Sequence, residues 1–452
     1  MRPYGCLVGA VLAAASTAWA AEEGTAIARS VAVDQVGYPA PLPKYAFARE
    51  PADSFVVIDA AAQTVLFRAS MDLWKSPDPA TGRSVYRGDF SAFRQPGRYR
   101  LVTSRGDTSS AFSISDTVYG PVYRSALKGF TYQRCGTQLS AAVAGVYQHP
   151  ACHLLDGVYH SSTDTSGFHA ASGGWHDAGD YGKYIVNAGI SVGTLLLAYE
   201  MWPERFAQDN VGIAESGNHV PDILDEARYE LEWFLRMQHT DGGFWFKVTR
   251  EQFEGFIMPQ NDAGARYIYT LSSAATGDAA ACLARAARIF QAYDQPFAET
   301  CRQASVRAWD YLTVHWSIVP PGGFTNPSGT STGEYGDDDD ADERLWAAAE
   351  LFETTGEETY HSYFQSSYIF GPLFGAAMWW GDVRPLALLT YLRSAQPAAV
   401  GSVKAELDAA LTTYCNSQVS RRNASATIRR TSHGYAEAAA ASGKELCTCQ
   451  VS

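Results

Sequence analysis

The chain has 452 residues, of which 46% are hydrophobic and 18% charged, so it is long enough for a large buried core and more than one domain. Its formal net charge of −13 argues against a nucleic-acid partner or an anionic membrane surface and allows a neutral substrate such as a sugar. No apolar run beyond the N-terminal segment is long enough to cross a bilayer, so we expect no membrane association.

The first twenty residues predict a secretory signal peptide. Arg2 precedes an apolar run from Leu7 to Ala15, and Ala18-Trp19-Ala20 predicts cleavage after Ala20. Cys6 lies in this segment, and the seven remaining cysteines are an odd number, so at least one thiol is outside any disulfide. We therefore expect a secreted monomer, extracellular or periplasmic.

Residues 26–116 predict a small all-β domain. Short β-type runs alternate there with turns such as Gly37-Tyr38-Pro39 and Gln95-Pro96-Gly97. This spacing is typical of an antiparallel sandwich of immunoglobulin type, although the Cys…Trp…Cys core signature is absent. The runs are Val31–Val36, Lys44–Ala48, Phe55–Ile58, Thr64–Phe67, Val85–Tyr86, Tyr99–Thr103 and Ala111–Ile114.

After Tyr119 the hydrophobic period becomes helical. The clearest segments are 223–235, 345–352 and 403–414, and Pro221 followed by acidic residues marks one helix start. About ten helices joined by Gly- and aromatic-rich loops fit between Tyr119 and Cys415, which predicts a mainly α domain of helical hairpins over 117–422. Residues 423–452 have no apolar periodicity and form an atypical tail.

The stretch from Gly173 to Lys183 contains the most chemistry in the chain. Asp177 and Asp180 stand three residues apart, so in a tight turn both carboxylates leave the same side of the backbone. Two carboxylates in one cleft suit hydrolysis, and the neighbouring glycines allow a substrate to approach the backbone. The alternative is a capped, Gly-rich helix entry in which the aspartates only accept backbone N–H groups.

The chain resembles the glycoside hydrolase family 9 cellulases over residues 30–420. That family often carries an immunoglobulin-like domain before an (α/α)6 barrel, so the resemblance implies both domains. The Gly173–Lys183 stretch is the most specific motif. The other matching residues are Val33–Tyr38, Asp89–Ser91, Pro96–Tyr99, Gln133–Gly136, His149–His153, Asp241–Gly243 and Asp342–Trp346.

The resemblance implies an inverting endo-β-1,4-glucanase acting on cellulose or related β-glucans. In such an enzyme a carboxylate activates a water on one face of the sugar, and an acid on the opposite face protonates the leaving oxygen. By resemblance Asp180 is the base, and Asp177 holds and polarises the water. Sugar rings also stack on flat aromatic surfaces, for which the candidates are Trp175, Tyr181, Phe244 and Trp245.

The general acid of the family is a glutamate in an Asn-Glu pair near the end of the barrel, and no such pair occurs here. The last barrel helices are also not recognisable, while Glu437 and Glu445 lie in a segment that does not match. A truncated chain, a shifted reading frame after about Asn423 and a decayed copy all remain open. We therefore expect the chain as written to be inactive.

Two functional alternatives also remain open. One is an exo-acting glycosidase on cello- or chito-oligosaccharides, which loops at one end of the cleft would decide. The other is a carbohydrate-binding protein that has lost turnover, favoured by the missing acid and opposed by the intact aspartate pair.

Four residues suggest a structural zinc site. Two thiols and two imidazoles are the ligand set of tetrahedral Zn²⁺, and some family members carry such a site at the matching positions. The alternative is a Cys135–Cys152 disulfide with two surface histidines. The four residues are Cys135, Cys152, His153 and His176.

The acidic run over 337–343 suggests a structural calcium site. Such a run is usually a solvated loop, but six to eight oxygen ligands around Ca²⁺ would relieve its self-repulsion. Family members bind calcium here. The matching residues are Asp337, Asp339, Asp342, Glu343 and the distant Asp382.

Overall fold

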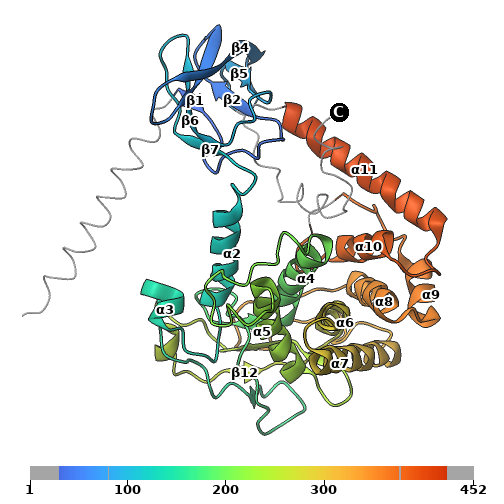
Figure 1. Ribbon diagram of the computed structural model, residues 1–452. Helices are drawn as coiled ribbons and strands as arrows, with labels where there is room; N and C mark the ends of the chain where they lie inside the picture. Colours follow the sequence, from blue (N-terminus) through green and yellow to red (C-terminus); the bar gives the residue numbers. More distant parts are fainter. Residues whose placement is uncertain (1–29, 80, 376–377, 425–452) are drawn as a thin grey trace, which may run out of the picture. The chain divides into compact units, whose positions relative to one another are not determined.

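The computed structural model describes residues 30–79, 81–375 and 378–424, which divide into two compact units (Figure 1). One unit is built from residues 30–123 and the other mainly from residues 124–419. The predicted signal peptide and residues 425–452 of the predicted tail lie outside the described part. None of the described helices combines the length and the apolar character needed to cross a membrane.

Seven antiparallel strands form the first unit, in the order β1-β2-β5-β4-β3-β6-β7. The 11-residue strand β4 pairs with β3 through its first half and with β5 through its second half, so it belongs to both parts of the sandwich. Alternating side chains of the strands meet in a core rich in aromatic rings, including Tyr38, Phe55, Phe90 and Phe112. The strands are β1 (Val31–Ala32), β2 (Tyr45–Ala48), β3 (Ser54–Asp59), β4 (Val65–Lys75), β5 (Val85–Asp89), β6 (Gly97–Thr103) and β7 (Phe112–Ile114).

Ten α-helices follow in the part of the chain that the structure describes. As predicted from Pro221 and its acidic neighbours, one begins at Asp222, and segments 345–352 and 403–414 lie within two others. The helices are α2 (Gly120–Tyr132), α3 (Ala141–Ala144), α4 (Ile185–Met201), α5 (Asp222–Met237), α6 (Ser273–Phe290), α7 (Gln295–Val314), α8 (Ala341–Thr355), α9 (Glu358–Ser367), α10 (Arg384–Arg393) and α11 (Gly401–Ala424).

The helices of the second unit form an inner and an outer layer. Helices α4, α6, α8 and α10 pack side by side in that order, and α6 and α8 are buried around nearly their whole circumference. Each of α5, α7 and α9 packs against the inner helix that precedes it in the chain, as Figure 1 shows for α6 and α7. This is the hairpin arrangement of an (α/α) barrel, and it confirms the predicted fold class.

Glycines allow the inner helices to approach one another closely. A Cβ on Gly193 of α4 would lie 2.4 Å from the Trp346 ring of α8, and one on Gly277 of α6 would lie 2.6 Å from Cβ of Glu343. Any larger side chain would therefore push the helices apart.

Six short strands connect the helices where α4 and α6 begin. Backbone hydrogen bonds from Ile185 to Phe246 and from Phe246 to Thr270 bring these segments together. The N-terminal end of the inner helices thus carries the loops in which the candidate residues lie. The strands are β8 (Val158–Tyr159), β9 (Lys183–Tyr184), β10 (Phe244–Trp245), β11 (Lys247–Thr249), β12 (Tyr267–Ile268) and β13 (Leu271–Ser272).

Candidate active site

The two candidate carboxylates lie in a tight turn before α4. The Asp177 N–H donates to the Gly182 carbonyl over 2.8 Å, which closes the turn. Gly174 has φ +74°, and a Cβ there would lie 2.7 Å from the Trp233 ring, so only glycine fits. The turn therefore has a defined shape, and both aspartates lie at the N-terminal end of α4.

Asp177 is exposed, and both of its carboxylate oxygens accept hydrogen bonds. Oδ1 accepts from Asn187 Nδ2 at 2.8 Å, and Oδ2 accepts from the Tyr335 hydroxyl at 2.7 Å. Burial raises the pKa of Tyr335 to about 12, with Asp177 as the next cause, so this phenol stays a neutral donor near neutral pH. Asp177 is thus oriented from two sides.

Asp180 lies in a different environment from Asp177. It is half-buried, its Oδ2 accepts only a 3.3 Å hydrogen bond from the Tyr184 hydroxyl, and its Oδ1 has no partner among the described residues. Burial, and then the charge of Asp177, raise the pKa of Asp180 above its ordinary value. An oxygen without a donor and a raised proton affinity are properties of a general base.

A cavity of about 320 Å³ lies beside this turn. Among the residues that the structure describes, no glutamate lines it, so it contains no candidate for the predicted general acid. The lining residues are Ala126, Gly129, Phe130, Gln133, Trp175, His176, Asp177, Tyr184, Asn187, Ala188 and Ser191.

Two buried glutamates of α5 hold the backbone just before the turn. Glu230 accepts from the Trp175 N–H at 2.5 Å, and Glu226 accepts from the Trp175 indole N–H at 2.8 Å. Glu226 also pairs with Arg134 at 3.0 Å. Trp175 is 6% exposed and lines the cavity, so buried charged groups fix its position there.

The other three predicted stacking surfaces are not free ring faces. Phe244 and Trp245 are 0% and 3% exposed, because they form β10, which packs against β13 and helices α5 and α6, so neither presents a face to a sugar. Tyr181 is half-buried, with its ring against His153 and His176. The three aromatic residues that follow Gly242 and Gly243 did not distinguish a buried strand from an open platform.

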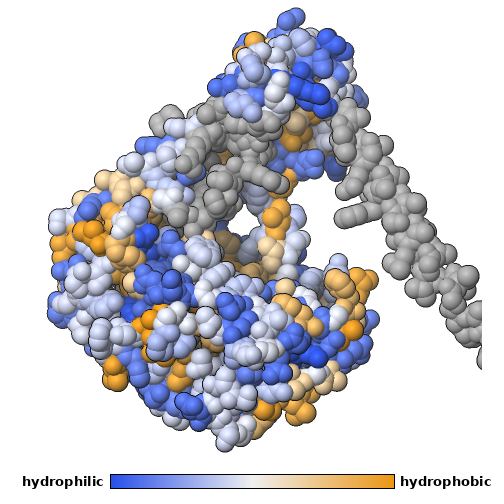
Figure 2. Space-filling model, turned by 180° about the vertical axis from the view of Figure 1, so that it is seen from behind, coloured by the Kyte–Doolittle hydropathy of each residue, from blue (hydrophilic) through white to orange (hydrophobic). Residues whose placement is uncertain are grey.

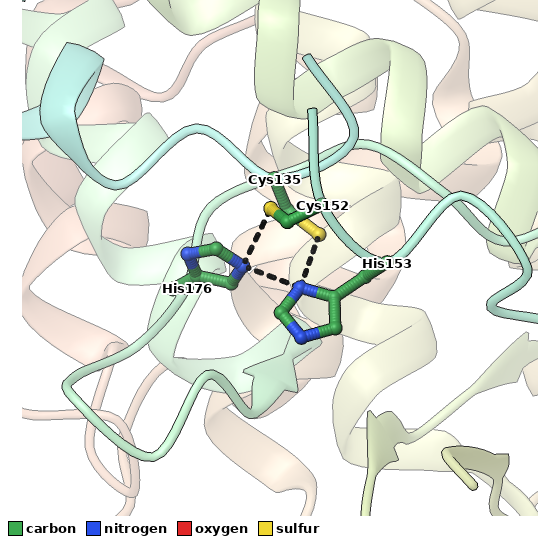
Figure 3. A group of neighbouring side chains, drawn as sticks. All are labelled: Cys135, Cys152, His153 and His176. Carbon is green, nitrogen blue, oxygen red and sulfur yellow. Dashed lines mark hydrogen bonds between the residues drawn. The ribbon is translucent and has the colours of Figure 1, made fainter. Parts of the chain in front are cut away.

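The structure brings the four predicted zinc ligands together (Figure 3). Their ligand atoms all lie within 4.8 Å of one another, and all four side chains point toward a common centre. Cys135 Sγ lies 3.7 Å from His153 Nδ1, Cys152 Sγ lies 3.8 Å from His176 Nε2, and the two nitrogens are 3.2 Å apart. Both cysteines are free thiols, so the structure does not contain the alternative disulfide.

These spacings fit a tetrahedral ion. With Zn–S near 2.3 Å and Zn–N near 2.05 Å, ligand atoms at tetrahedral angles lie about 3.6 Å (S to N) and about 3.3 Å (N to N) apart. On its outer side His153 Nε2 contacts Asp262 Oδ2 at 3.2 Å, the partner that orients many metal-bound histidines. We refer to these four residues as the thiol–imidazole cluster.

Carboxylates also gather at the start of α8. Burial and neighbouring carboxylates raise the pKa of Glu343 and of Asp278 well above their ordinary values. Burial raises the pKa of Asp342 to about 6, and the pKa values of Asp337 and Asp382 are raised mainly by burial as well. We refer to these five residues as the acidic cluster.

Several oxygens of the acidic cluster have no donor. Both oxygens of Asp278 and of Glu343, and Oδ2 of Asp337, lack a hydrogen-bond partner within the described ranges. Such oxygens suit a hard cation, which would also remove the repulsion between the charges. The predicted Asp339 differs, because it is exposed and its Oδ1 accepts from the Ala341 N–H.

Three residues of these sites were not found from the sequence. Tyr335 and Asn187 contact Asp177 from 158 and 10 residues away. Tyr335 stands between Glu334 and Gly336, directly before the acidic run, and that position is the signal that could have identified it. Asp278 is a lone acid in the Ala-rich helix α6, and that isolation on a buried helix is the one signal that would have identified it.

Comparisons with known proteins identify the family and the fold of this chain. The family model described as glycosyl hydrolase family 9 matches residues 119–446, and a model of the cellulase N-terminal Ig-like domain matches residues 26–108. Endoglucanase D of Acetivibrio thermocellus is 40% identical over 338 residues, which cover 73% of this chain and 53% of that protein. A cellodextrinase of Butyrivibrio fibrisolvens is 33% identical over 74% of this chain and 60% of its own length.

Solved structures of family 9 endoglucanases have a similar fold. A metagenome-derived family 9 endoglucanase superposes with a TM-score of 0.79 at 33% identity, covering 88% of this chain and 74% of that one. A zinc-binding triple mutant of the family 9 endoglucanase J30 gives 0.80 at 30% identity, over 89% and 76% of the two chains. This chain spans only about half the length of the first curated relatives that it matches. Because the family model matches well over half of its residues, the chain belongs to glycosyl hydrolase family 9.

Proposed function

We propose that the site of this chain is that of an enzyme that hydrolyses β-1,4-glucosidic bonds of cellulose or related β-glucans with inversion, acting within the polymer. Without an assigned proton donor, the chain as written should act only on substrates whose leaving group departs unprotonated. The observation that carries the proposal is the difference between the two carboxylates of the turn. Asp177 is hydrogen-bonded on both oxygens, whereas Asp180 has one oxygen without a donor and a raised pKa. The relatives named endoglucanase and cellodextrinase support the substrate class.

The roles of the two aspartates follow from these environments. Asp180 accepts a proton from water as that water attacks the anomeric carbon. Asp177, fixed by Asn187 and Tyr335, holds the same water in line and stabilises the positive charge that develops on the sugar. Attack on the face opposite the leaving oxygen inverts the anomeric configuration.

The proton donor for the leaving oxygen is not assigned to a residue, so the test must not depend on it. In 2,4-dinitrophenyl β-cellobioside the leaving phenolate departs without a proton, so activation of water alone drives its hydrolysis. The expected result is steady release of dinitrophenolate by the unaltered protein, and loss of nearly all of it in Asp180→Asn. Equal rates in the two proteins would contradict the role of Asp180.

The cavity lining favours a second candidate, a carbohydrate-binding protein without turnover, because it includes no glutamate among the described residues. Binding of cello-oligosaccharides together with no release of dinitrophenolate would favour this candidate. An exo-acting enzyme is distinguished by its products, since it shortens soluble cellulose from one end and lowers viscosity slowly.

We further propose that the thiol–imidazole cluster binds one structural Zn²⁺. The observed spacings fit a tetrahedral ion, and the J30 triple mutant, which has a similar fold, is a zinc-binding protein. Bound zinc would hold His176, and with it the turn that begins at Asp177. Elemental analysis of purified protein, with about one zinc per chain expected, tests this proposal.

We propose Ca²⁺ for the acidic cluster, with Asp278 added to the predicted ligands and Asp339 outside the site. Neighbouring buried carboxylates disfavour one another's ionisation, and a cation among them would let them stay ionised. Its role is structural, because it would fix the start of α8 and the segment that carries Tyr335. Asp337 lies two residues after Tyr335.

We also propose that the protein is exported from the cell. This proposal rests on Arg2, the apolar run Leu7–Ala15 and the predicted cleavage site after Ala20. Protein recovered from outside the cells should begin at Ala21 by N-terminal sequencing. Size-exclusion chromatography checks the expected monomer.

A further inference from the structure

The loop between β11 and the short 3-10 helix Pro259–Asn261 carries an unusual surface. Its aromatic rings are turned to solvent, with Phe253 54% exposed and Phe256 fully exposed, and Met258 is 45% exposed. Single exposed apolar residues are common, but three within six residues on one loop form a patch of the kind that marks a binding site. We call residues 251–258 the Phe256 loop.

The ends of this loop are firmly held. Arg250 forms ion pairs with Glu254 inside the loop and with Asp262 beyond it, the latter at 2.6 Å. Ser331 donates its N–H to the Glu251 carbonyl at 2.7 Å and its hydroxyl to Gln252 at 2.6 Å. The loop that carries the exposed rings is therefore fixed at both ends by contacts with the rest of the unit.

The loop adjoins the candidate active site. The Tyr181 hydroxyl donates to the Ile257 carbonyl, and Tyr181 follows Asp180 directly in the chain. On its other side the loop contacts the segment 329–335 through Gln252 and Ser331, and that segment leads to Tyr335, the donor to Asp177. The Phe256 loop thus lies between the two segments that hold the carboxylates.

Hydropathy alone does not single out this loop. On the face shown in Figure 2, hydrophobic residues form several separate groups among hydrophilic ones. What distinguishes the Phe256 loop is its continuity with the turn that carries Asp177 and Asp180.

We propose that Phe256, with Phe253 beside it in the loop, forms a stacking platform for a glucosyl unit of the β-glucan chain away from the bond that is cleaved. This proposal rests on the proposed function and names a substrate-binding surface for it. The axial C–H groups of a glucopyranose cover a flat aromatic ring of this kind. Unlike the buried Phe244 and Trp245, these rings are open to a ligand.

The test measures binding without turnover. Isothermal titration of the Asp180→Asn protein with cellohexaose gives the reference Kd. Adding Phe256→Ala should raise this Kd about fivefold to tenfold, because an aromatic stacking contact contributes on the order of one factor of ten in affinity. Phe253→Ala should also raise the Kd, by a smaller factor.

Two further variants separate stacking from apolar contact and from folding. Phe256→Trp keeps a flat ring and should bind within about twofold of the reference, whereas Phe256→Leu should bind as weakly as the alanine variant. Tyr293→Ala is the matched control, because it removes a 36% exposed ring just after α6 ends, at the opposite end from the turn, and should leave the Kd unchanged. Equal melting temperatures show that the variants are folded.

The outcomes separate this inference from the proposed function. Cellohexaose binding that is unchanged in both Phe256→Ala and Phe253→Ala overturns the platform and leaves the proposed function intact. The same holds if Phe256→Trp binds as weakly as Phe256→Ala. No measurable binding by the reference protein overturns the proposed substrate class and the platform with it.

Discussion

The thiol–imidazole cluster and the acidic cluster adjoin two different segments, one that carries Asp177 and one that carries its hydrogen-bond donor Tyr335. His176 of the first cluster precedes Asp177 directly, and Tyr335, two residues before Asp337 of the second, donates to its Oδ2. The first cluster already has the spacings of a tetrahedral site, whereas the second contains buried carboxylate oxygens without any donor. An ion at the first cluster would order the turn that carries Asp177, whereas an ion at the second would relieve charge repulsion.

The largest effect is expected from breaking the thiol–imidazole cluster. Cys152→Ser replaces a thiolate ligand by a hydroxyl, which should lower zinc affinity more than about 100-fold and reduce dinitrophenyl cellobioside hydrolysis with it, because His176 adjoins Asp177. Elemental analysis and the hydrolysis rate check both results. Cys301→Ser is the matched control, since Cys301 is an equally buried free thiol in α7 that should leave the zinc content unchanged. Full zinc content in Cys152→Ser would refute the ligand set.

Removing calcium should lower stability. An ion present at one hundred times its Kd stabilises the folded state by about 2.7 kcal/mol, so chelation should reduce the melting temperature by about 5–10 °C. Differential scanning calorimetry measures the shift.

Two variants sharpen this prediction. Asp342→Asn should abolish the response to chelation, while Asp339→Asn should keep it, because Asp339 is exposed and accepts from the start of α8. If both variants lose the response, Asp339 is a ligand, as the sequence predicted. If unaltered protein does not respond to chelation, the calcium proposal is wrong.

A smaller effect is expected when only the donor to Asp177 is removed. Tyr335→Phe deletes one hydrogen bond to an exposed carboxylate and should slow hydrolysis about tenfold with little change in melting temperature. Steady-state kinetics on the dinitrophenyl substrate check it, with Tyr293→Phe as a control distant from the turn. An unchanged rate would mean that Tyr335 does not position Asp177 during the reaction.

The smallest effects concern pH. Because Asp180 must be ionised to act as a base, activity should fall as the pH drops through its raised pKa, so the acid limb lies above the range of an ordinary aspartate. Asp177→Asn removes a charge that raises this pKa and should move the limb of the residual activity to lower pH. Tyr184→Phe removes a hydrogen bond that lowers the pKa of Asp180, so it should move the acid limb of the activity profile to higher pH. Profiles of kcat/KM against pH measure both shifts, and shifts in the same direction would contradict the assignment of the base.

The sequence predicted those features that depend on local pattern. The start of α5 after Pro221 is one example, because helix-start signals act within a few residues, and the ligand set of the thiol–imidazole cluster was identified from its residue types and the family resemblance. Residues 68–75 of β4 lie outside the predicted run Thr64–Phe67. Only Met71 among them is buried, and their strand character comes from pairing with β3 and β5.

Features that depend on tertiary packing were not predictable in this way. Tyr335 contacts Asp177 across 158 residues, and Asp278 meets Glu343 only because α6 and α8 pack together. Phe244 and Trp245 were expected to be accessible, but they are buried, because β10 packs against β13 and helices α5 and α6. The exposed rings of the Phe256 loop stand between segments of the chain that only the fold brings together.

The most direct test of the central claim is the configuration of the first product. Proton NMR during hydrolysis of 2,4-dinitrophenyl β-cellobioside by the unaltered protein should show α-cellobiose appearing first and the β anomer only later by mutarotation, because water activated by Asp180 attacks opposite the leaving group. Initial formation of β-cellobiose would show a covalent intermediate and contradict the account.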